Sequence, residues 1–336
     1  MNKSPMIKNY EIVKAVSPSM RYKSGESFDE WKKEAKKKLY TLLGMDRFTQ
    51  CSPDFNLEYV KDEGEFTEYR FTMRSEENYY FPAVMRVPAG VEGKMPLIVC
   101  LQGHSTGFHI SLGVPKFEGD QNTISGGDRD FAVRAVKEGF IALCIEQRNF
   151  GECSGKEEPG TNCFQSSMRA LLTGRTTIGE RVWDIQRCLD VVLERFDFID
   201  TARIMCMGNS GGGTATIYAA CLEERFSLAM PSCAVCTYKH SIAAMHHCAC
   251  NYIPDIANYF DMGDLCAMVA PRKLVIVNGA QDTGFLKEGV DECYEVAKAG
   301  YAAAGVKDYC RLVTGAQGHR FYADLSWPVL HELEKI

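Results

Sequence analysis

Several features that would assign this chain to a broad class are missing from its 336 residues. No apolar run approaches the roughly 18 residues that a membrane-spanning helix needs, so we expect no association with a membrane. The first residues hold no apolar stretch of the kind that a secretory signal requires, which favours a cytoplasmic location. We also find no internal repeat and no low-complexity segment.

Long basic runs are missing as well. The formal net charge is −6 at pH 7, and the one basic cluster, residues 32–38, has the spacing of the solvated face of a helix. Nucleic-acid binding is therefore not expected. The partner that this composition favours is a small molecule, and homo-oligomer formation stays open.

Cysteine, in contrast, is abundant. The chain has fifteen cysteines, an odd number, and several of them (Cys100, Cys144 and Cys206) lie within apolar stretches that read as strands. Without an export signal, this pattern favours free and mostly buried thiols in a reducing compartment rather than a disulfide framework.

One group of cysteines and histidines raises the alternative of a structural zinc site. Its members are Cys233, Cys236, His246, His247, Cys248 and Cys250. The C-x-C spacing is not the usual zinc-binding pair, and adjacent histidines diverge on a helix or a strand. We therefore expect these side chains to pack within their loop, and we expect no metal ion and no cofactor.

From residue 97 onward, short apolar stretches alternate with helical ones, which predicts an α/β fold with a mostly parallel central sheet and helices on both faces. The predicted strands are 97–101, 140–146, 203–207, 228–230, 273–278 and 310–314, and the predicted helices are 129–138, 176–196, 291–304 and 325–335.

The remaining segments suggest how the domain is organised. Residues 1–55 are expected to form a helical extension packed on the core, because residues 27–43 read as an amphipathic helix with Ser27 as its N-cap. Residues 56–336 would then form a single domain. Within it, residues 56–95 read as antiparallel edge strands. Residues 149–175 and 236–268 read as lid-like insertions near the active site.

Residues 204–214 carry the most specific motif. An apolar stretch leads into Gly208-Asn209-Ser210-Gly211-Gly212, and a good helix sequence follows. A strand, a G-x-S-x-G turn and a helix make up the nucleophile elbow, in which a strained turn exposes the serine hydroxyl. Side chains at Gly208 and Gly212 would clash across such a turn. Ser210 is thus the predicted nucleophile.

A serine nucleophile needs a base, and the base needs an acid that orients it. Asp282 and His319 each follow an apolar strand downstream of Ser210, in the chain order that this architecture uses. Asp282 could instead be a turn residue and His319 an ordinary loop histidine. Taken together with the elbow, their order and their positions at strand ends favour a Ser210–Asp282–His319 triad.

Two backbone N–H groups are needed to stabilise the oxyanion of an acyl-transfer reaction. The candidates are Gly211, which follows the nucleophile, and His104, which lies in the loop after the first central strand. The His104 side chain is left open as structural or pocket-lining. Arg148 begins the first insertion, and we favour an ion pair that pins this loop over a contact with an anionic substrate.

These motifs, with Leu101-Gln-Gly-His104, Glu146–Gly151 and Ala270–Gly279, resemble the α/β-hydrolase superfamily. The resemblance is closest to its bacterial dienelactone-hydrolase and acetyl-xylan-esterase-like branch, and it spans about residues 97–330. It implies an α/β-hydrolase fold and a cofactor-free serine esterase that acts through Ser210, Asp282 and His319. It also suggests small acyl esters, acetylated sugars among them, as substrates.

Two alternatives remain. One is a serine peptidase of the prolyl-oligopeptidase type, which shares this fold and triad order but carries a large additional domain, for which the residues before the sheet are too few. The other is a hydrolase-fold binding protein without catalytic activity, against which the intact Ser210, Asp282 and His319 argue.

Overall fold

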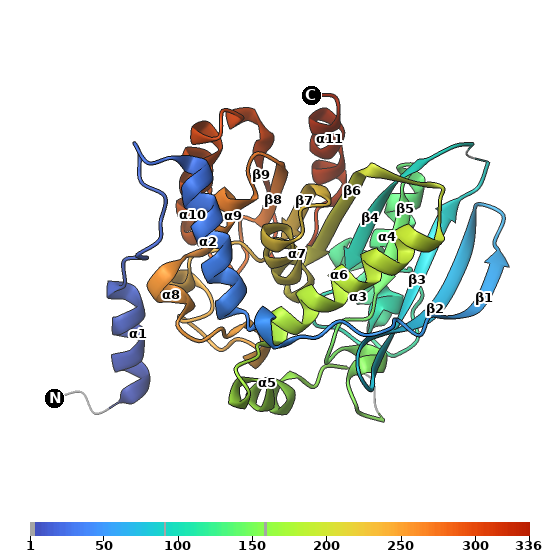
Figure 1. Ribbon diagram of the computed structural model, residues 1–336, viewed down its shortest axis with the longest axis horizontal. Helices are drawn as coiled ribbons and strands as arrows, with labels where there is room; N and C mark the ends of the chain where they lie inside the picture. The colour runs from blue at the N-terminus through green and yellow to red at the C-terminus, as the bar shows by residue number, and fades with distance from the viewer. Residues whose placement is uncertain (1–3, 91, 158–159) are drawn as a thin grey trace.

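A central mixed sheet organises the molecule (Figure 1). The computed structural model describes residues 4–90, 92–157 and 160–336, so the predicted segments 1–55, 56–95 and 149–175 each include one to three positions outside it. Within the described residues, nine strands lie in the order β1-β2-β3-β5-β4-β6-β7-β8-β9. The strands are β1 (Asn56–Asp62), β2 (Phe66–Glu76), β3 (Tyr79–Pro88), β4 (Met95–Leu101), β5 (Ile141–Ile145), β6 (Ile199–Asn209), β7 (Phe226–Ser232), β8 (Lys273–Gly279) and β9 (Cys310–Gly315).

Strand direction divides the sheet into two parts. β1, β2 and β3 pair antiparallel, and β3 joins β5 antiparallel. From β5 across β4, β6, β7 and β8 to β9, every pairing is parallel. The predicted mostly parallel sheet with an antiparallel edge is therefore confirmed. Because parallel strands end on the same edge, the loops after β4, β6, β8 and β9 all leave from one side of the molecule.

The helices connect these strands and cover both faces of the sheet (Figure 1). None in the described part of the chain has the length and apolar character to cross a bilayer. The α-helices are α1 (Pro5–Ala15), α2 (Phe28–Leu42), α3 (Asp120–Gly127), α4 (Phe131–Lys137), α5 (Cys163–Leu172), α6 (Thr177–Arg195), α7 (Gly211–Leu222), α8 (Ile256–Tyr259), α9 (Met262–Val269), α10 (Lys287–Ala303) and α11 (Ala323–Glu334).

Two hydrophobic cores lie on opposite faces of the sheet. Along β4, alternate side chains enter different cores, since successive residues of a strand point to opposite faces. Leu97 and Val99 pack into the larger core, with α2, α6, α7, α9 and α10. Ile98 and Cys100 pack into the smaller one, with α4 and α11. The sheet is thus buried on both faces, as its continuous apolar strands predict.

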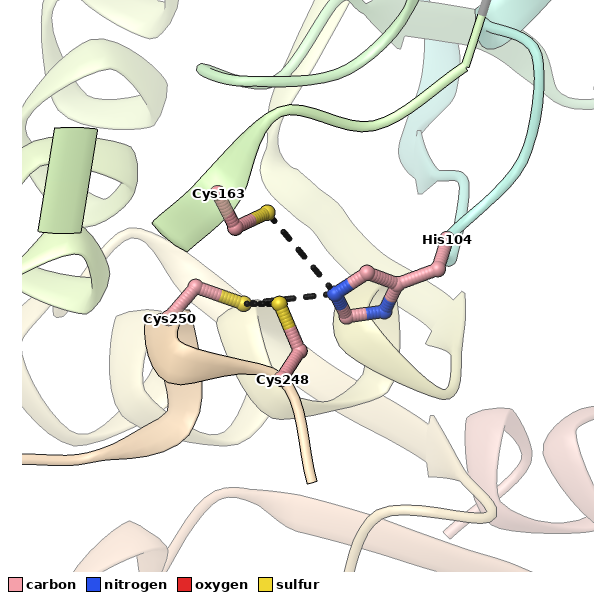
Figure 2. A group of neighbouring side chains, drawn as sticks. All are labelled: His104, Cys163, Cys248 and Cys250. Atoms are coloured by element: carbon pink, nitrogen blue, oxygen red, sulfur yellow. Dashed lines mark hydrogen bonds between the residues drawn. The ribbon is translucent and has the colours of Figure 1, made fainter. Parts of the chain in front are cut away.

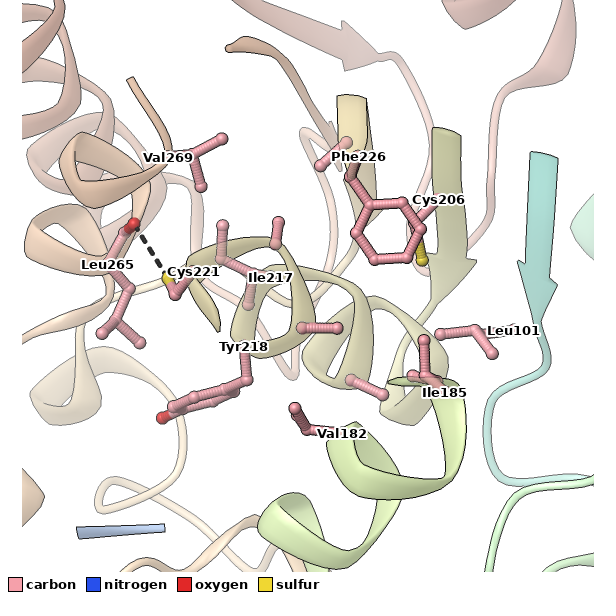
Figure 3. Close-up of a cluster of buried hydrophobic side chains, with 14 of the residues drawn as sticks. Leu101, Val182, Ile185, Cys206, Ile217, Tyr218, Cys221, Phe226, Leu265 and Val269 are labelled. Carbon is pink, nitrogen blue, oxygen red and sulfur yellow. Dashed lines mark hydrogen bonds between the residues drawn. The ribbon is translucent and has the colours of Figure 1, made fainter. Parts of the chain in front are cut away.

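Helix α7, which follows Ser210, lies at the centre of the larger core (Figure 3). Its residues from Gly211 to Cys221 are all buried. Ile217 and Tyr218 pack among side chains of neighbouring elements, and the Cys221 thiol donates to the Leu265 carbonyl of α9 at 3.3 Å. Each large apolar side chain buried in this way contributes about 1.5–3 kcal/mol. The elbow is therefore built on one of the most firmly held helices.

The N-terminal segment contributes to the larger core through α2. The Ser27 hydroxyl caps this helix by accepting from the Glu30 N–H at 3.4 Å, as predicted. The apolar face of α2 is buried, and it consists of Phe28, Trp31, Ala35 and Leu39. Helix α1 was not predicted. It buries none of its residues, and the Tyr10 hydroxyl donates to the Lys239 carbonyl at 3.0 Å.

Both predicted insertions are more regular than their sequences suggest. The first contains α5, an amphipathic helix that the sequence analysis did not predict. The second ends in α9, whose residues are all buried and whose apolar side chains belong to the larger core. Helix α9 is therefore part of the core, and the lid-like character expected of this insertion stays a prediction. The strongly apolar sequence of α9 reflects its packing under α10 and not the covering of an active site.

Candidate functional site

Ser210 lies at the turn between β6 and α7. Its backbone has φ 57° and ψ −122°, a conformation that L-residues rarely adopt. Holding a residue in such a region costs on the order of 1–3 kcal/mol, which the surrounding packing must supply. The Ser210 N–H donates to the Ser232 carbonyl at the end of β7, at 2.8 Å. The strand, strained turn and helix form the elbow that the motif predicts.

The glycines of the elbow are required by close backbone contacts. A Cβ atom on Gly208 would lie 2.6 Å from the carbonyl carbon of Gly212, and one on Gly212 would lie 2.0 Å from the Leu101 oxygen. Real Cβ atoms do not approach other atoms this closely, so both positions accept only glycine. The clash that the sequence analysis inferred across this turn is present in the structure.

Asp282 and His319 are brought together from the loops after β8 and β9. The His319 Nδ1 atom lies 2.8 Å from Asp282 Oδ2. The other carboxylate oxygen, Oδ1, accepts from the Gly284 N–H at 2.8 Å and the Phe285 N–H at 3.2 Å. The Asp282 side chain is buried, whereas that of His319 keeps 33% of its surface exposed. This arrangement fixes the ring through Nδ1 and leaves the histidine accessible to a ligand.

Electrostatic interactions keep the Asp282 carboxylate charged. Burial raises its pKa, but the hydrogen bond and charge of His319 and the Gly284 N–H outweigh burial and leave this pKa below its ordinary value. Cys233 lies close to the pair. Burial, with the nearby Asp282 charge, raises the pKa of the Cys233 thiol to about 12, so this thiol stays protonated near neutral pH.

Ser232 joins the His319 loop to the elbow. Its hydroxyl donates to the carbonyl of Arg320, the residue after His319, at 3.2 Å, and accepts from the Asn209 side chain at 3.1 Å. Its own carbonyl accepts from the Ser210 N–H. The predicted nucleophile and the Asp282–His319 pair are therefore anchored at the carboxyl ends of neighbouring parallel strands.

The loop after β4 packs directly against the elbow. A Cβ atom on Gly103 would lie 2.6 Å from the Asn209 oxygen and 3.0 Å from the Ser210 Cβ atom, so the loop approaches as closely as glycine permits. Across the described part of the chain, the N–H groups of His104 and Gly211 donate to no other protein group. Neither predicted oxyanion donor therefore has a competing acceptor, and Gly103, the residue before His104, lies against Ser210.

Glu146, buried at the end of β5, holds the far side of this loop. Its carboxylate oxygens accept from the Phe108 N–H at 3.2 Å, and one of them accepts from the Glu152 N–H at the same distance. Burial raises the pKa of Glu146 to about 8, and the backbone N–H groups of Phe108 and Glu152 oppose this rise. Glu146 therefore connects the segment after β4 to the start of the first insertion.

Arg148 has the structural role that the sequence analysis favoured. It forms two hydrogen bonds to Asp184, of 2.7 and 2.8 Å, and an ion pair with Glu76 at 2.5 Å. Its guanidinium also lies over the ring of Tyr79, 4.0 Å from the centroid. With its charge neutralised in a buried network, Arg148 pins the first insertion to α6 and β2.

The predicted cysteine and histidine group does not come together as one cluster. Cys233 lies beside the Asp282–His319 pair, the Cys236 thiol donates to the Leu286 carbonyl at 3.5 Å, and His247 Nε2 contacts the Gly284 carbonyl at 3.3 Å. Cys248 and Cys250 lie together, and their neighbours are His104 and Cys163. The sequence analysis missed Cys163, because no spacing connects it with the other three.

Comparisons with known proteins agree with this architecture. A model of a family described as the abhydrolase family matches residues 4–317. The putative hydrolase YtaP of Bacillus subtilis (strain 168) is 28% identical over 245 residues, which make up 71% of this chain and 77% of that protein.

Two solved structures share the fold. One is a putative acetyl xylan esterase from Bacteroides fragilis NCTC 9343, with a TM-score of 0.84 and 16% identity, covering 100% of this chain and 96% of that one. The other is a glucuronoyl esterase from Solibacter usitatus, with a TM-score of 0.69 and 16% identity, covering 96% and 97%. The resemblance to α/β-hydrolases inferred from the motifs is therefore confirmed.

Proposed function

The chain belongs to the abhydrolase family, and on that premise we propose that it is a serine-dependent carboxylic ester hydrolase. The observation that carries the proposal is the 2.8 Å contact between His319 Nδ1 and the buried Asp282 carboxylate, placed on the same sheet edge as the strained Ser210 turn. A serine elbow alone could be an incidental turn. A carboxylate that orients a partly exposed histidine beside it is what acyl transfer requires.

The proposed reaction has two steps. In the first, His319 takes the proton of the Ser210 hydroxyl as the oxygen bonds to the ester carbonyl carbon, and the N–H groups of Gly211 and His104 stabilise the oxyanion. The bond to the alcohol oxygen then breaks, and His319 returns the proton to the leaving alcohol. In the second step, His319 takes a proton from water as the water oxygen bonds to the acyl carbon. The bond from this carbon to the Ser210 oxygen then breaks, and His319 returns the proton to Ser210, which releases the acid and restores the hydroxyl.

Asp282 supports both steps without becoming protonated. Its hydrogen bond keeps the Nδ1 proton of His319 in place, so that Nε2 is the atom that exchanges protons with Ser210 and the substrate. Its negative charge also stabilises the imidazolium that forms in each step. The low pKa of Asp282 is consistent with this role, since the carboxylate stays charged wherever the histidine can act as a base.

For the substrate, we propose small acyl esters of sugars or similar alcohols. This rests on the solved neighbours, which are named as esterases of carbohydrate substrates. A panel of esters graded by acyl length, with nitrophenyl and sugar alcohols, tests it. Activity that falls steeply beyond acetyl supports the proposal, and a flat or long-chain profile contradicts it.

The same panel, extended by prolyl-aminoacyl amides and a fluorophosphonate probe, tests the two alternatives. Turnover of prolyl-aminoacyl amides in preference to esters would instead indicate a peptidase. The elements described before β4 are the strands β1, β2 and β3, which join the sheet, the helix α2, which packs on it, and the short helix α1. They do not form a large separate screening domain. A protein that turns over nothing and does not react with a fluorophosphonate probe would be a binding protein.

A further inference from the structure

A second set of reactive side chains lies beside the elbow. The imidazole of His104 and the thiols of Cys163, Cys248 and Cys250 point toward one another (Figure 2). Their four ligand atoms all lie within 4.8 Å of one another. His104 comes from the loop after β4, Cys163 begins α5, and Cys248 and Cys250 come from the turn around residues 249–251. Four side chains from three separate segments of the chain thus converge on one site.

The distances within this group match those of a tetrahedral metal site. His104 Nε2 lies 3.3 Å from the Cys250 sulfur and 3.9 Å from the Cys163 sulfur, and the Cys248 and Cys250 sulfurs are 3.4 Å apart. With Zn–S bonds of about 2.3 Å and Zn–N bonds of about 2.0 Å, neighbouring ligands in a tetrahedron lie roughly 3.5–3.8 Å apart. A disulfide would need two sulfurs at about 2.05 Å.

The positive charge next to the cluster also favours a metal–thiolate site. Arg181 is almost fully buried, and its guanidinium contacts the Cys250 sulfur at 3.5 Å and the Cys163 sulfur at 3.9 Å. No carboxylate of the described residues lies within ion-pair distance of it. Its other partners are the Arg148 carbonyl, at 3.0 Å, and the face of the Phe150 ring, whose centroid is 4.2 Å away, and neither carries a negative charge. A buried cation needs a nearby negative charge. Neutral thiols do not provide one.

We propose that His104, Cys163, Cys248 and Cys250 bind one zinc ion. Three thiolates and a neutral imidazole around a divalent cation carry a net charge of −1, which the single charge of Arg181 neutralises. Binding releases the three thiol protons to solvent, because only thiolates bind the metal. Soft sulfur ligands with one imidazole in a tetrahedron select zinc over hard cations such as Mg²⁺. All four positions are filled by protein, so the site is structural.

Such an ion would fix three segments around the elbow. It would tie α5 of the first insertion and the 248–250 turn of the second to the loop after β4. The His104 ring also lies against the start of α7, where a Cβ atom on Gly211 would come within 2.9 Å of it. An effect of zinc on the oxyanion donors rests on the proposed function; the metal site itself does not.

The first test measures metal in the unmodified protein. The full chain, purified without chelators, should contain about one zinc ion per chain, and chelation should release it, expose three additional reactive thiols and lower Tm. Refilling with Co²⁺ should produce the intense visible and near-ultraviolet bands of a tetrahedral cobalt–thiolate complex. Absence of zinc, together with no cobalt–thiolate spectrum on reconstitution, would overturn the proposal, as would a native disulfide between two of the three cysteines.

The second test assigns the ligands with matched variants. Cys163→Ser, Cys250→Ser and His104→Gln should each lose most of the bound zinc. Cys51→Ser and His247→Gln make the same chemical changes outside the cluster and should keep it. If the control variants lose zinc and the cluster variants keep it, the ion is bound elsewhere. Where a cluster variant fails to fold, the cobalt spectrum of the wild-type protein decides between three thiolate ligands and none.

Metal content and ester hydrolysis can fail independently. Ser210→Ala should abolish turnover and keep one zinc per chain. A metal-free protein that hydrolyses esters at full rate would contradict the zinc site and leave the esterase proposal intact. A zinc-containing protein that hydrolyses no ester would contradict the esterase proposal and leave the zinc site intact.

Discussion

Two histidines near the elbow have opposite environments. His319 pairs through Nδ1 with a carboxylate and keeps a third of its side-chain surface exposed. His104 is largely enclosed, and its Nε2 atom faces the sulfurs of Cys163 and Cys250. A carboxylate partner fixes the ring and stabilises its protonated form, which suits proton transfer. Sulfur ligands around a buried ring suit metal binding.

The two environments also differ in how they are built. Asp282 and His319 follow β8 and β9, which are adjacent, parallel and paired along most of their length. Their separation is therefore fixed by the sheet itself. His104 lies in the loop after β4, Cys163 begins α5 in the first insertion, and the other two cysteines lie in a turn of the second insertion. No pairing between strands fixes the distances among these three segments. A bound metal ion would crosslink these segments and so fix their relative positions.

The largest effect should come from removing the nucleophile. Ser210→Ala should lower kcat by about 10⁶-fold, because His319 then has no hydroxyl to activate and only the remaining site stabilises the transition state. The change should be measured by ester hydrolysis and by labelling with a fluorophosphonate probe, which should disappear. Ser125→Ala, the same change on an exposed residue of α3, serves as the control. Retained labelling of the Ser210 variant would place the nucleophile elsewhere.

The next effect should separate the two histidines. Asp282→Asn should lower kcat by about 10³- to 10⁴-fold, since the amide no longer holds the Nδ1 proton of His319 or stabilises the imidazolium. The zinc content should stay unchanged, because Asp282 contacts His319 and none of the four proposed zinc ligands. Steady-state kinetics and metal analysis on the same sample provide both measurements, and Asp308→Asn on the surface is the control. Near wild-type kcat would mean that His319 does not depend on Asp282.

A smaller effect on kcat should follow from a substitution that places an extra atom against the His104 ring. In Gly211→Ala, the new Cβ atom would meet the His104 Cε1 and Nδ1 atoms at 2.9 Å, so the ring and its loop must shift. We expect kcat to fall by about 10²-fold through displaced oxyanion donors, with a smaller change in KM. Gly126→Ala, where nothing lies within 4 Å of the new atom, is the matched control. Unchanged kcat would argue against an oxyanion role for this pair of N–H groups.

The contrast between the two regions also explains what the sequence could predict. The elbow, Asp282 and His319 could be located because each directly follows an apolar strand, and parallel strands end on one edge. The buried face of α2 could be located from its periodicity. The strand pattern also identified the antiparallel edge formed by β1, β2 and β3.

Other parts could not be predicted, for physical reasons. Helix α1 has no apolar stripe, and α9 is apolar all round because it is buried on every side, so neither shows a helical periodicity that distinguishes it. Cys163 and Cys250 lie 59 and 146 residues from His104, and only the paths of the insertions bring them together. No local spacing encodes such a meeting point.

The smallest effect concerns stability in acid. His319 and the Gly284 N–H hold the pKa of Asp282 below its ordinary value, against the opposing effect of burial. A carboxyl with a lowered pKa adds stability that is fully present above its unfolded pKa of about 3.9 and is lost as pH falls through the folded pKa. Urea midpoints of the wild type should therefore drop more steeply below about pH 4 than those of Asp282→Asn. Parallel curves for the two proteins would show that the carboxylate partner distinguishing His319 from His104 is not formed in solution.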